Sequence, residues 1–514
     1  MSLTRRATGW LLLGVLAAAG AVLVSSPVGA SNWNAVPRFD ARMAFTDNAR
    51  LTPRRGRADT VTRVAPGLDL AMRGSRLTAD IGYVLAHDAY VRDRSLDATR
   101  HALRGTGRAE LFADRFFLDI GAFSDDAPAS SAGRVPALDR ALGGDATGLR
   151  GITASPQLRT RLAGLGVGDL RYLVGRVEGY GGNAARRLSG TDIQRGHVSL
   201  MQEPEHGRLR WRIEGEHAET RTDGLRAGAP EGVSLRRSGV AARPAFALTR
   251  GFDLIGGAGF DRVASRGQTD GIATPAWSAG LRYAPSPLTR IEVAHGRRFG
   301  APDWSVGVAA STQAGSSLEI VHRRAIESQA LQASLAAISA AQGGRIDNAD
   351  MRPGVAFADR EAMFDTDDRP YAERESAATL RVARARDTLS LAVSRTTRDT
   401  GLGGRPTVTR RVDVATSAAL AWSRAMTQTL QADAGLSLAR LSTERADPTA
   451  PPGTFATVTR SARLGIERTI HPALRVGIGA ALVRRDISGT AADRPGPGLG
   501  YGETVAFVTL RKSF

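Results

Sequence analysis

The sequence predicts an all-β fold, a transmembrane antiparallel up-and-down β-barrel of about 22 strands, with 18 to 24 accepted. Three observations lead to this prediction. Short segments alternate between apolar and polar residues, and the connections between them alternate between short and long. The 514 residues include no cysteine and, after the N-terminal region, no apolar run long enough for a membrane helix. An exported chain without disulfides needs another source of stability, and closure of a barrel supplies one.

The first 30 residues have the pattern of a secretory signal peptide. Arg5 and Arg6 precede an apolar stretch, and the small residues up to Ala30 suit signal peptidase. The stretch has about 15 apolar residues, whereas a helix needs roughly 20 to span a bilayer. We therefore expect cleavage after Ala30, a mature barrel over residues 31–514, and a place in the outer membrane of a Gram-negative bacterium.

The clearest strand pattern lies between Arg208 and Glu216. Apolar Leu209, Trp211 and Ile213 alternate with charged residues, and a period of two places the two sets on opposite faces of a strand. A heavily charged face suits a water-filled lumen in which opposite charges pair. The candidate lumen charges are Arg208, Arg210, Arg212, Glu214 and Glu216.

The same alternation recurs along the chain, for example from Leu77 to Leu85, from Trp277 to Tyr283 and from Leu474 to Leu482. Ten short turns separate such segments, and longer polar connections lie between the hairpins. Outer-membrane barrels have short periplasmic turns and long outer loops. Ten hairpins with a first and a last strand give 22 strands, and an even number places both ends in the periplasm.

The C-terminal residues resemble the assembly signal that the outer-membrane insertion machinery reads. Ala506, Val508 and Leu510 share one face of the last strand, and the chain ends in the aromatic Phe514. Lys512 departs from the pattern, although its stem can snorkel to the interface.

The longest outer connection spans residues 325–375. Leu331, Leu335 and Ile338 have helical spacing in an Ala-rich stretch. The segment folds into the lumen as a plug, covers the outer mouth as a lid, or stays a mobile external loop with a marginal helix, since an isolated short helix is poorly stable.

The formal net charge of +18 favours anionic partners. All basic residues except Lys512 are arginines, and they are spread along the whole chain without a nucleic-acid-binding motif. The expected partners are lipopolysaccharide phosphates and acidic polysaccharide rather than nucleic acid. The residue pattern includes no catalytic, cofactor-binding or metal-binding motif, so we expect no cofactor and no enzymatic activity.

Several segments resemble the family of PEP-CTERM system-associated outer-membrane proteins, which are barrels found beside exosortase and exopolysaccharide genes. The similar segments are residues 45–52, 62–68, 152–159, 277–287 and 296–300. The resemblance implies a component of an extracellular-polymer or surface-protein system, and it brings no catalytic residues.

Three functional classes remain, and the first two are favoured over the third. The first is a porin-like conduit with an Arg-rich lumen that concentrates anionic solutes or polymer. The second is a non-conducting surface scaffold whose loops bind extracellular polymer or partner proteins. The third, a lipid-modifying barrel enzyme, would need a Ser or His cluster at the outer rim, and the sequence does not supply one.

Overall fold

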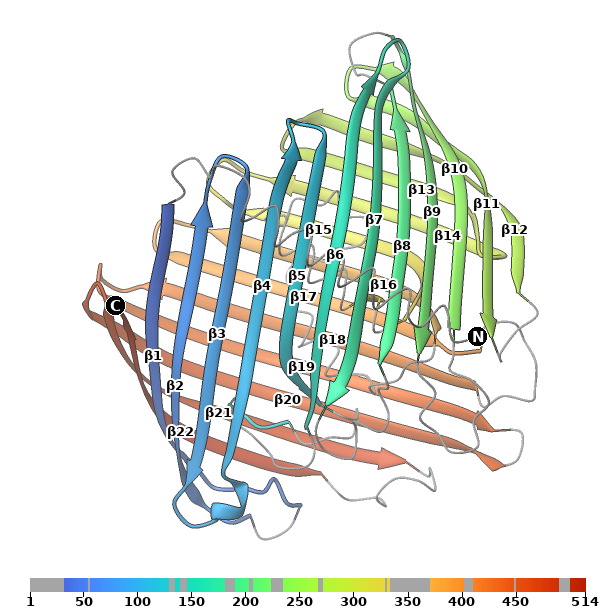
Figure 1. Cartoon of the computed structure of the whole chain (residues 1–514). Helices are drawn as coiled ribbons and strands as arrows, with labels where there is room; N and C mark the ends of the chain where they lie inside the picture. Colours follow the sequence, from blue (N-terminus) through green and yellow to red (C-terminus); the bar gives the residue numbers. More distant parts are fainter. Residues whose placement is uncertain are drawn as a thin grey trace, which may run out of the picture.

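The chain closes into one 22-stranded antiparallel sheet (Figure 1). The structure is a computed structural model, and it describes residues 32–53, 56–128, 135–138, 146–180, 190–202, 207–222, 234–266, 271–328, 331–332, 370–401, 410–447, 450–489 and 500–514. The predicted signal peptide lies outside the described residues. Within those residues, no helix has the length and apolar character that a membrane-spanning helix requires.

The strands follow one another in chain order around the barrel. They are β1 (Asn32–Thr46), β2 (Asp59–Arg73), β3 (Leu77–Tyr90), β4 (Ala98–Phe112), β5 (Phe116–Pro128), β6 (Ala146–Leu162), β7 (Gly166–Tyr180), β8 (Thr191–Met201), β9 (Leu209–Thr222), β10 (Ser234–Thr249), β11 (Phe252–Arg266), β12 (Ile272–Ser286), β13 (Thr289–Arg298), β14 (Ala301–Ser311), β15 (Ser317–Glu327), β16 (Tyr371–Ala383), β17 (Asp387–Asp399), β18 (Arg410–Ala425), β19 (Leu430–Asp447), β20 (Ala450–His471), β21 (Leu474–Gly489) and β22 (Tyr501–Ser513). One short 3-10 helix, η1 (Arg94–Leu96), follows β3.

The two ends of the chain close the barrel. β1 pairs with β2 on one side and with β22 on the other, in a register that runs from Arg38 opposite Ser513 to Thr46 opposite Val505. Every hydrogen-bonded neighbour is antiparallel, so the up-and-down topology and the count of 22 strands predicted from the sequence are confirmed. Closure leaves no unpaired sheet edge, which is the condition for a sheet in a bilayer.

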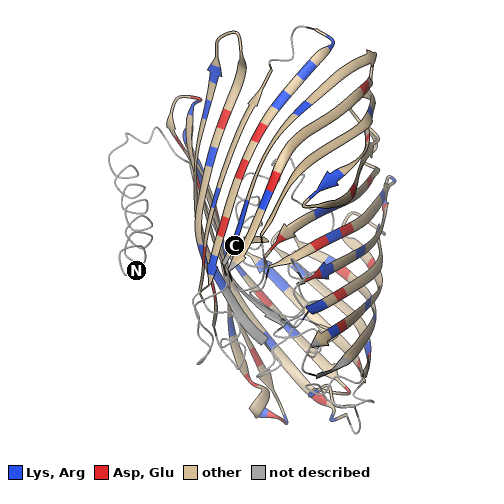
Figure 2. Cartoon of the chain, turned by 90° about the vertical axis from the view of Figure 1, so that its right-hand side faces the viewer, with Lys and Arg blue, Asp and Glu red and all other residues tan. Residues whose placement is uncertain are grey.

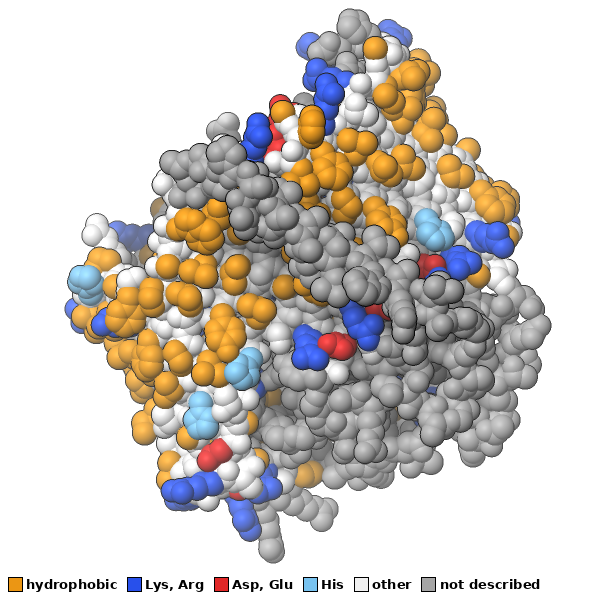
Figure 3. Space-filling model, in the orientation of Figure 1, with side chains coloured by type: hydrophobic (Ala, Val, Ile, Leu, Met, Phe, Trp, Pro, Cys, Tyr) orange, Lys and Arg blue, Asp and Glu red, His pale blue; other side chains and the backbone are white. Residues whose placement is uncertain are grey.

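The ladder register assigns each strand one face toward the lumen and one toward the outside. The predicted apolar runs of β3, β12 and β21 all lie on the outside, where Ile81, Trp277 and Ile478 are exposed. Hydrophobic side chains cover much of the exterior of β1 to β4, and charged side chains gather below them (Figure 3). The alternation in the sequence therefore separates an apolar exterior from a polar interior.

The two ends of the barrel differ in their connections. Ten short connections, the number predicted from the sequence, lie at one end of the barrel, here called the turn end. The opposite end, here called the loop end, carries the other connections. Most of these are longer, but two have only two residues each. β13 and β14 are joined by Phe299 and Gly300 alone, and β19 and β20 by residues 448–449.

The last strand carries the candidate assembly-signal residues on one face. Ala506, Val508 and Leu510 are exposed on the exterior face, and Phe514 follows at the turn end. The Lys512 ammonium lies 4.3 Å from the centre of the Phe514 ring. Both residues thus remain at the rim, where a cation and an aromatic ring suit the interface.

Candidate functional site in the barrel lumen

Positions of basic and acidic residues alternate along many of the strands (Figure 2). Of the predicted lumen charges, Arg210 forms an ion pair with Asp253, and Arg212 forms one with Glu214. Arg243 also contacts Glu214, at 3.0 Å. Arg208 differs, because it precedes β9 at the turn end and is exposed. Four of the five predicted lumen charges, Arg210, Arg212, Glu214 and Glu216, therefore form ion pairs with opposite charges, and among the described residues Arg208 forms none.

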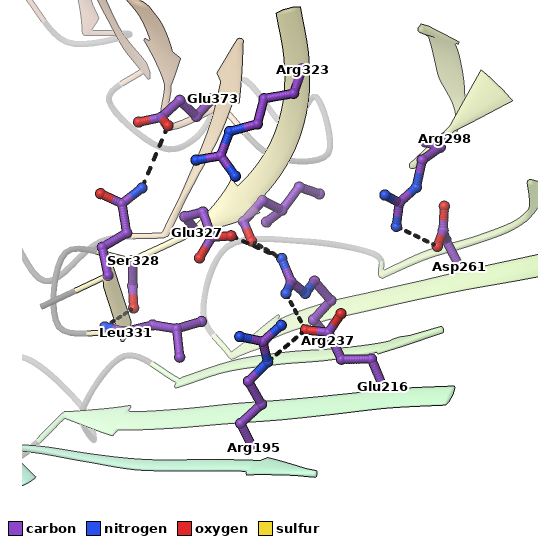
Figure 4. A network of polar contacts seen from close by, with 12 residues as sticks. Arg195, Glu216, Arg237, Asp261, Arg298, Arg323, Glu327, Ser328, Leu331 and Glu373 are labelled. Atoms are coloured by element: carbon purple, nitrogen blue, oxygen red, sulfur yellow. Dashed lines mark hydrogen bonds and ion pairs between the residues drawn. The ribbon is translucent and has the colours of Figure 1, made fainter. Parts of the chain in front are cut away.

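Glu216, the last of the predicted charges, belongs to a larger cluster deeper in the lumen (Figure 4). Its carboxylate accepts from the guanidinium of Arg237 and lies 3.1 Å from Nε of Arg195. Arg237 Nη1 lies 3.2 Å from Glu327 Oε1 and donates to the carbonyl of Ile326 at 2.7 Å. Arg237 is therefore the link between the wall strands β9 and β10 and the end of β15.

The chain after Glu327 turns into the lumen rather than away from it. Residues 326–328 and 331–332, here called the β15 segment, are all buried. The hydroxyl of Ser328 accepts from the backbone N–H of Leu331 at 3.3 Å, and the carbonyl of Ser328 accepts from the N–H of Gln332 at 3.1 Å. Ser328 therefore caps the first turn of a helix at Leu331–Gln332. The start of the predicted helix is thus present, whereas Leu335 and Ile338 lie outside the described residues.

Leu331 reaches a wall far from its own hairpin. It is 1% exposed and belongs to one apolar cluster with lumen-facing side chains of β7, β8 and β9. These side chains are Leu173, Val177, Ile193 and Ala218. Strands β10 to β14 separate this wall from β15. The β15 segment therefore crosses part of the lumen, which is the path expected for a plug formed by residues 325–375. Because β15 ends at Glu327 and β16 begins at Tyr371, the connection itself consists of residues 328–370.

The opposite flank of the β15 segment contacts β16 and β17. Gln332 Nε2 donates to Glu373 at 3.5 Å, and Arg398 Nε donates to the other oxygen of Glu373 at 2.9 Å. The Arg398 guanidinium also stacks over the ring of Tyr371, 4.5 Å from its centre. Because Glu373 and Arg398 are both buried, their charges must be paired with each other to be tolerated there.

The short β13–β14 hairpin supports the base of the segment. Phe299 and Gly300 both have positive φ, 50° and 77°, as a two-residue hairpin turn of type I′ demands. This conformation is unusual for phenylalanine. Asp261 holds it by accepting from the N–H of Phe299 at 3.1 Å, and the buried Phe299 ring joins Ile326 in an apolar cluster. The short β13–β14 hairpin therefore packs, through Phe299, against Ile326 at the end of β15.

A second connection also contacts the lumen wall. Residues 135–138, between β5 and β6 and here called the β5–β6 segment, lie against β21, β22 and β1. Val135 N–H donates to the Tyr501 hydroxyl at 2.6 Å, which donates back to the Val135 carbonyl at 3.0 Å. Ala137 N–H donates to Glu503 at 2.8 Å. Leu138 is buried in a cluster that includes Val61, Val505 and Phe507.

Two neighbouring loops, whose Ala49 and Leu96 share the apolar cluster of Leu138, are joined by an ion pair. Arg50, between β1 and β2, donates to Asp93 and to Ser95, which follow β3. The hydrogen bonds from Arg50 and then Ser95 lower the pKa of Asp93 to about 2. The carboxylate is therefore charged at every physiological pH.

The turn end of the lumen carries a cavity of about 550 Å³. Its lining includes Arg38, Arg42, Arg63, Arg475 and Arg511, together with Asp40. Glycine is needed at position 67, because a Cβ there would lie 2.7 Å from Arg38 Nε and 2.9 Å from the backbone carbonyl oxygen of Tyr83. Arg38 crosses this glycine and forms an ion pair with Asp69 at 3.2 Å. The cavity at this end is thus rich in arginine, whereas two chain segments enter the lumen from the loop end.

Sequence reasoning missed most of the inward-folded residues. Three of these residues, Glu327, Arg237 and Glu503, lie on the lumen faces of strands. A charge at a lumen-facing position is the sequence signal that could have identified them. Nothing in Val135–Leu138 itself indicates a contact with β22. Among the described residues, no group of three or more His, Asp and Glu side chains is placed to hold a metal ion.

Comparisons with known proteins bear on the fold. A scan of family models and a search of curated proteins found no match. Among solved structures, a ferric enterobactin receptor of Pseudomonas aeruginosa in complex with enterobactin matches with a TM-score of 0.51 at 12% identity, over 95% of this chain and 82% of the receptor.

The siderophore receptor PirA of Acinetobacter baumannii matches with a TM-score of 0.47 at 8% identity, over 94% of this chain and 80% of that chain. The iron transporter FrpB of Neisseria meningitidis matches with 0.43 at 10% identity, over 94% and 81%. At such identities the likeness concerns the fold alone. The chain is a closed 22-stranded β-barrel of the outer-membrane type.

Proposed function

We propose that this chain is an outer-membrane conduit for anionic solutes or polymer, which the β15 segment and the β5–β6 segment restrict at the loop end. The observation that carries the proposal is the contact of Glu327 with Arg237. A carboxylate of an inward-folded segment there neutralises an arginine of the lumen wall. An anionic cargo offers the same chemistry, because carboxylates and phosphates are the groups that guanidinium binds best.

The contact suggests how the restriction is relieved. Cargo that enters from the basic cavity at the turn end competes with Glu327 for Arg237 and with Glu216 for Arg195. Exchange of one carboxylate for another costs little, because no buried arginine is left without a counter-charge at any stage. The proposal assigns no catalytic step to the chain.

The cargo class and the direction rest on the resemblance described above. Barrels of the PEP-CTERM system-associated family accompany exosortase and exopolysaccharide genes, which supports an acidic exopolysaccharide that moves outward. Lumen arginines paired to carboxylates support a polar path.

Planar-bilayer recording of the purified chain tests this proposal. We expect low conductance that rises when polygalacturonate, an acidic polysaccharide, is added at the turn end, and no rise with neutral dextran of the same size. Equal responses to both polymers would contradict the exchange of carboxylates. With residues 329–369 replaced by a short Gly-Ser linker, we expect steady conductance without any polymer.

Selectivity gives a matched test of the lumen charges in that linker variant. Arg210→Ser with Arg212→Ser leaves Asp253 and Glu214 with fewer arginines, so the reversal potential should shift toward cations. Arg221→Ser with Arg236→Ser removes two exposed arginines from the exterior of β9 and β10 and should leave it unchanged. Equal shifts in both variants would exclude the lumen arginines as the selective element.

The second candidate is a non-conducting surface scaffold for extracellular polymer or partner proteins. The apolar burial of Leu331 and Leu138 favours it, because such contacts hold both segments in place. Silence of both the full chain and the linker variant, each shown to be folded, would select the scaffold.

A further inference from the structure

A row of arginines crosses the exterior of four strands toward the loop end. The row consists of Arg395 on β17, Arg440 on β19, Arg460 on β20 and Arg484 on β21, all exposed. The ladder register aligns them: Thr416 of β18 lies opposite both Arg395 and Arg440. Arg460 lies opposite Leu438, two residues from Arg440, and directly opposite Arg484. We call these four residues the arginine row.

The row marks the edge of the apolar belt. On the same face, one step nearer the turn end, lie exposed hydrophobic side chains of the same strands, among them Val393, Leu438 and Leu482. Further apolar side chains continue below them, including Leu391, Leu436 and Ile478. The arginine row therefore lies at the height where the hydrocarbon of the membrane gives way to headgroups.

The charge of the row is only partly balanced by the protein. Asp486 on β21 forms ion pairs with both Arg460 and Arg484. Arg395 and Arg440 have no ion-pair partner within the described parts of the chain. Glu444 lies four residues beyond Arg440 on the same face of β19. Arginines directly opposite each other on neighbouring strands repel unless an anion lies between them. Within the described residues, Asp486 forms ion pairs with two of the four arginines of the row.

Some exterior arginines elsewhere on the barrel are fully balanced by carboxylates. Near the loop end of β6 to β8, Arg150 pairs with Glu178, and Arg176 pairs with Asp192. Those arginines have one carboxylate each, so they need no external counter-ion. The high arginine content therefore does not by itself produce an excess of positive charge on the exterior.

We propose that the arginine row binds the phosphate groups of lipid A in the outer leaflet of the membrane. Short turns lie on the periplasmic side of such barrels, so the loop end faces outward and the row faces the outer leaflet. Neighbouring strands are about 4.8 Å apart, so the guanidinium groups of β19, β20 and β21 follow one another closely, and Arg395 lies beyond Thr416 of β18. Arginine binds phosphate with two parallel hydrogen bonds. This inference does not depend on the conduit function.

Binding of purified barrel to diphosphoryl lipid A in phosphatidylcholine nanodiscs tests the proposal. The variant Arg395→Gln with Arg440→Gln is compared with the control Arg424→Gln with Arg468→Gln, which removes two exterior arginines at the turn end. A basic residue at an anionic membrane surface changes affinity about fivefold, so the row variant should retain lipid A at least about tenfold more weakly. The control should match the unaltered chain.

Thermal unfolding in phosphatidylcholine alone checks that both variants fold equally. Should the row variant be misfolded, Arg440→Gln alone replaces it, and a weaker loss of the same sign is expected. The proposal is overturned by equal retention in the row variant and the unaltered chain, or by equal losses in row variant and control. It is also overturned if lipid A without its phosphates binds as strongly.

Discussion

The β15 segment and the β5–β6 segment both enter the lumen from the loop end, but different forces hold them. Charged pairs fasten the β15 segment: Glu327 to Arg237, and Gln332 to the Glu373–Arg398 pair. The β5–β6 segment is held by backbone hydrogen bonds to Tyr501 and Glu503 and by the burial of Leu138. The β15 segment also has the apolar contacts of Ile326 and Leu331, but an anionic ligand can compete for its charged contacts. We therefore expect the β15 segment to move while the β5–β6 segment stays.

The largest expected effect comes from cutting the link of the β15 segment to the wall. Arg237→Met leaves the carboxylates of Glu216 and Glu327 with fewer cations in a buried cluster, and loss of one partner of a buried pair costs about 3–5 kcal/mol. We expect a lower thermal unfolding temperature and faster amide hydrogen exchange at residues 326–328.

The matched control changes the preceding residue of the same strand. Arg236 faces the exterior and pairs with Glu219, so Arg236→Met should cost no more than about 1 kcal/mol. Identical exchange at residues 326–328 in both variants would mean that Arg237 does not hold the segment.

A smaller effect is expected in the β5–β6 segment. Leu138→Ala should cost about 3 kcal/mol, because a buried leucine loses its contacts and leaves a cavity. Hydrogen exchange should rise at residues 135–138 and remain unchanged at residues 326–328. Coupled changes in both segments would show that they act as one unit and would remove the distinction between them.

Removal of a single hydroxyl should have a smaller effect again. Tyr501→Phe deletes the hydroxyl that bonds both the N–H and the carbonyl of Val135, for a cost of about 1 kcal/mol. Thermal unfolding would measure it. Stability equal to that of the unaltered chain would indicate that water replaces the hydroxyl.

The smallest effect concerns the exposed clamp between Arg50 and Asp93. A carboxylate with a lowered pKa contributes stability that is complete above its unfolded pKa, 3.8, and is lost as pH falls through about 2. Asp93→Asn should therefore behave like the unaltered chain below pH 2 and differ from it only above. A difference that persists at the acid end would exclude this ion pair as its cause.

The sequence predicts the parts of this fold that repeat. In the alternating segments from Leu77 to Leu85 and from Leu474 to Leu482, successive residues face the lipid and the lumen in turn. The strands, their two faces and the turns between them can therefore be predicted from this alternation. The orientation of Ala506, Val508 and Leu510 follows in the same way.

The inward segments could not be predicted because their contacts are distant in sequence. Val135 and Tyr501 are 366 residues apart, and no periodicity connects them. The path of the β15 segment depends on the short β13–β14 hairpin at residues 299–300, where Asp261 supports an unusual backbone conformation. Loop placement of this kind is a tertiary property.

The central claim is that the β15 segment moves to open the lumen, and cross-linking tests it most directly. The chain has no cysteine, so Leu331→Cys with Ile193→Cys introduces the only two thiols. Conductance is recorded in polygalacturonate with and without a short bismaleimide bridge between them. The account predicts that the bridged barrel stays closed, whereas the unbridged double variant and a bridged control on the exterior of β3 and β4, Tyr83→Cys with Leu103→Cys, conduct. Equal conductance of the bridged and unbridged Leu331–Ile193 variant would contradict it.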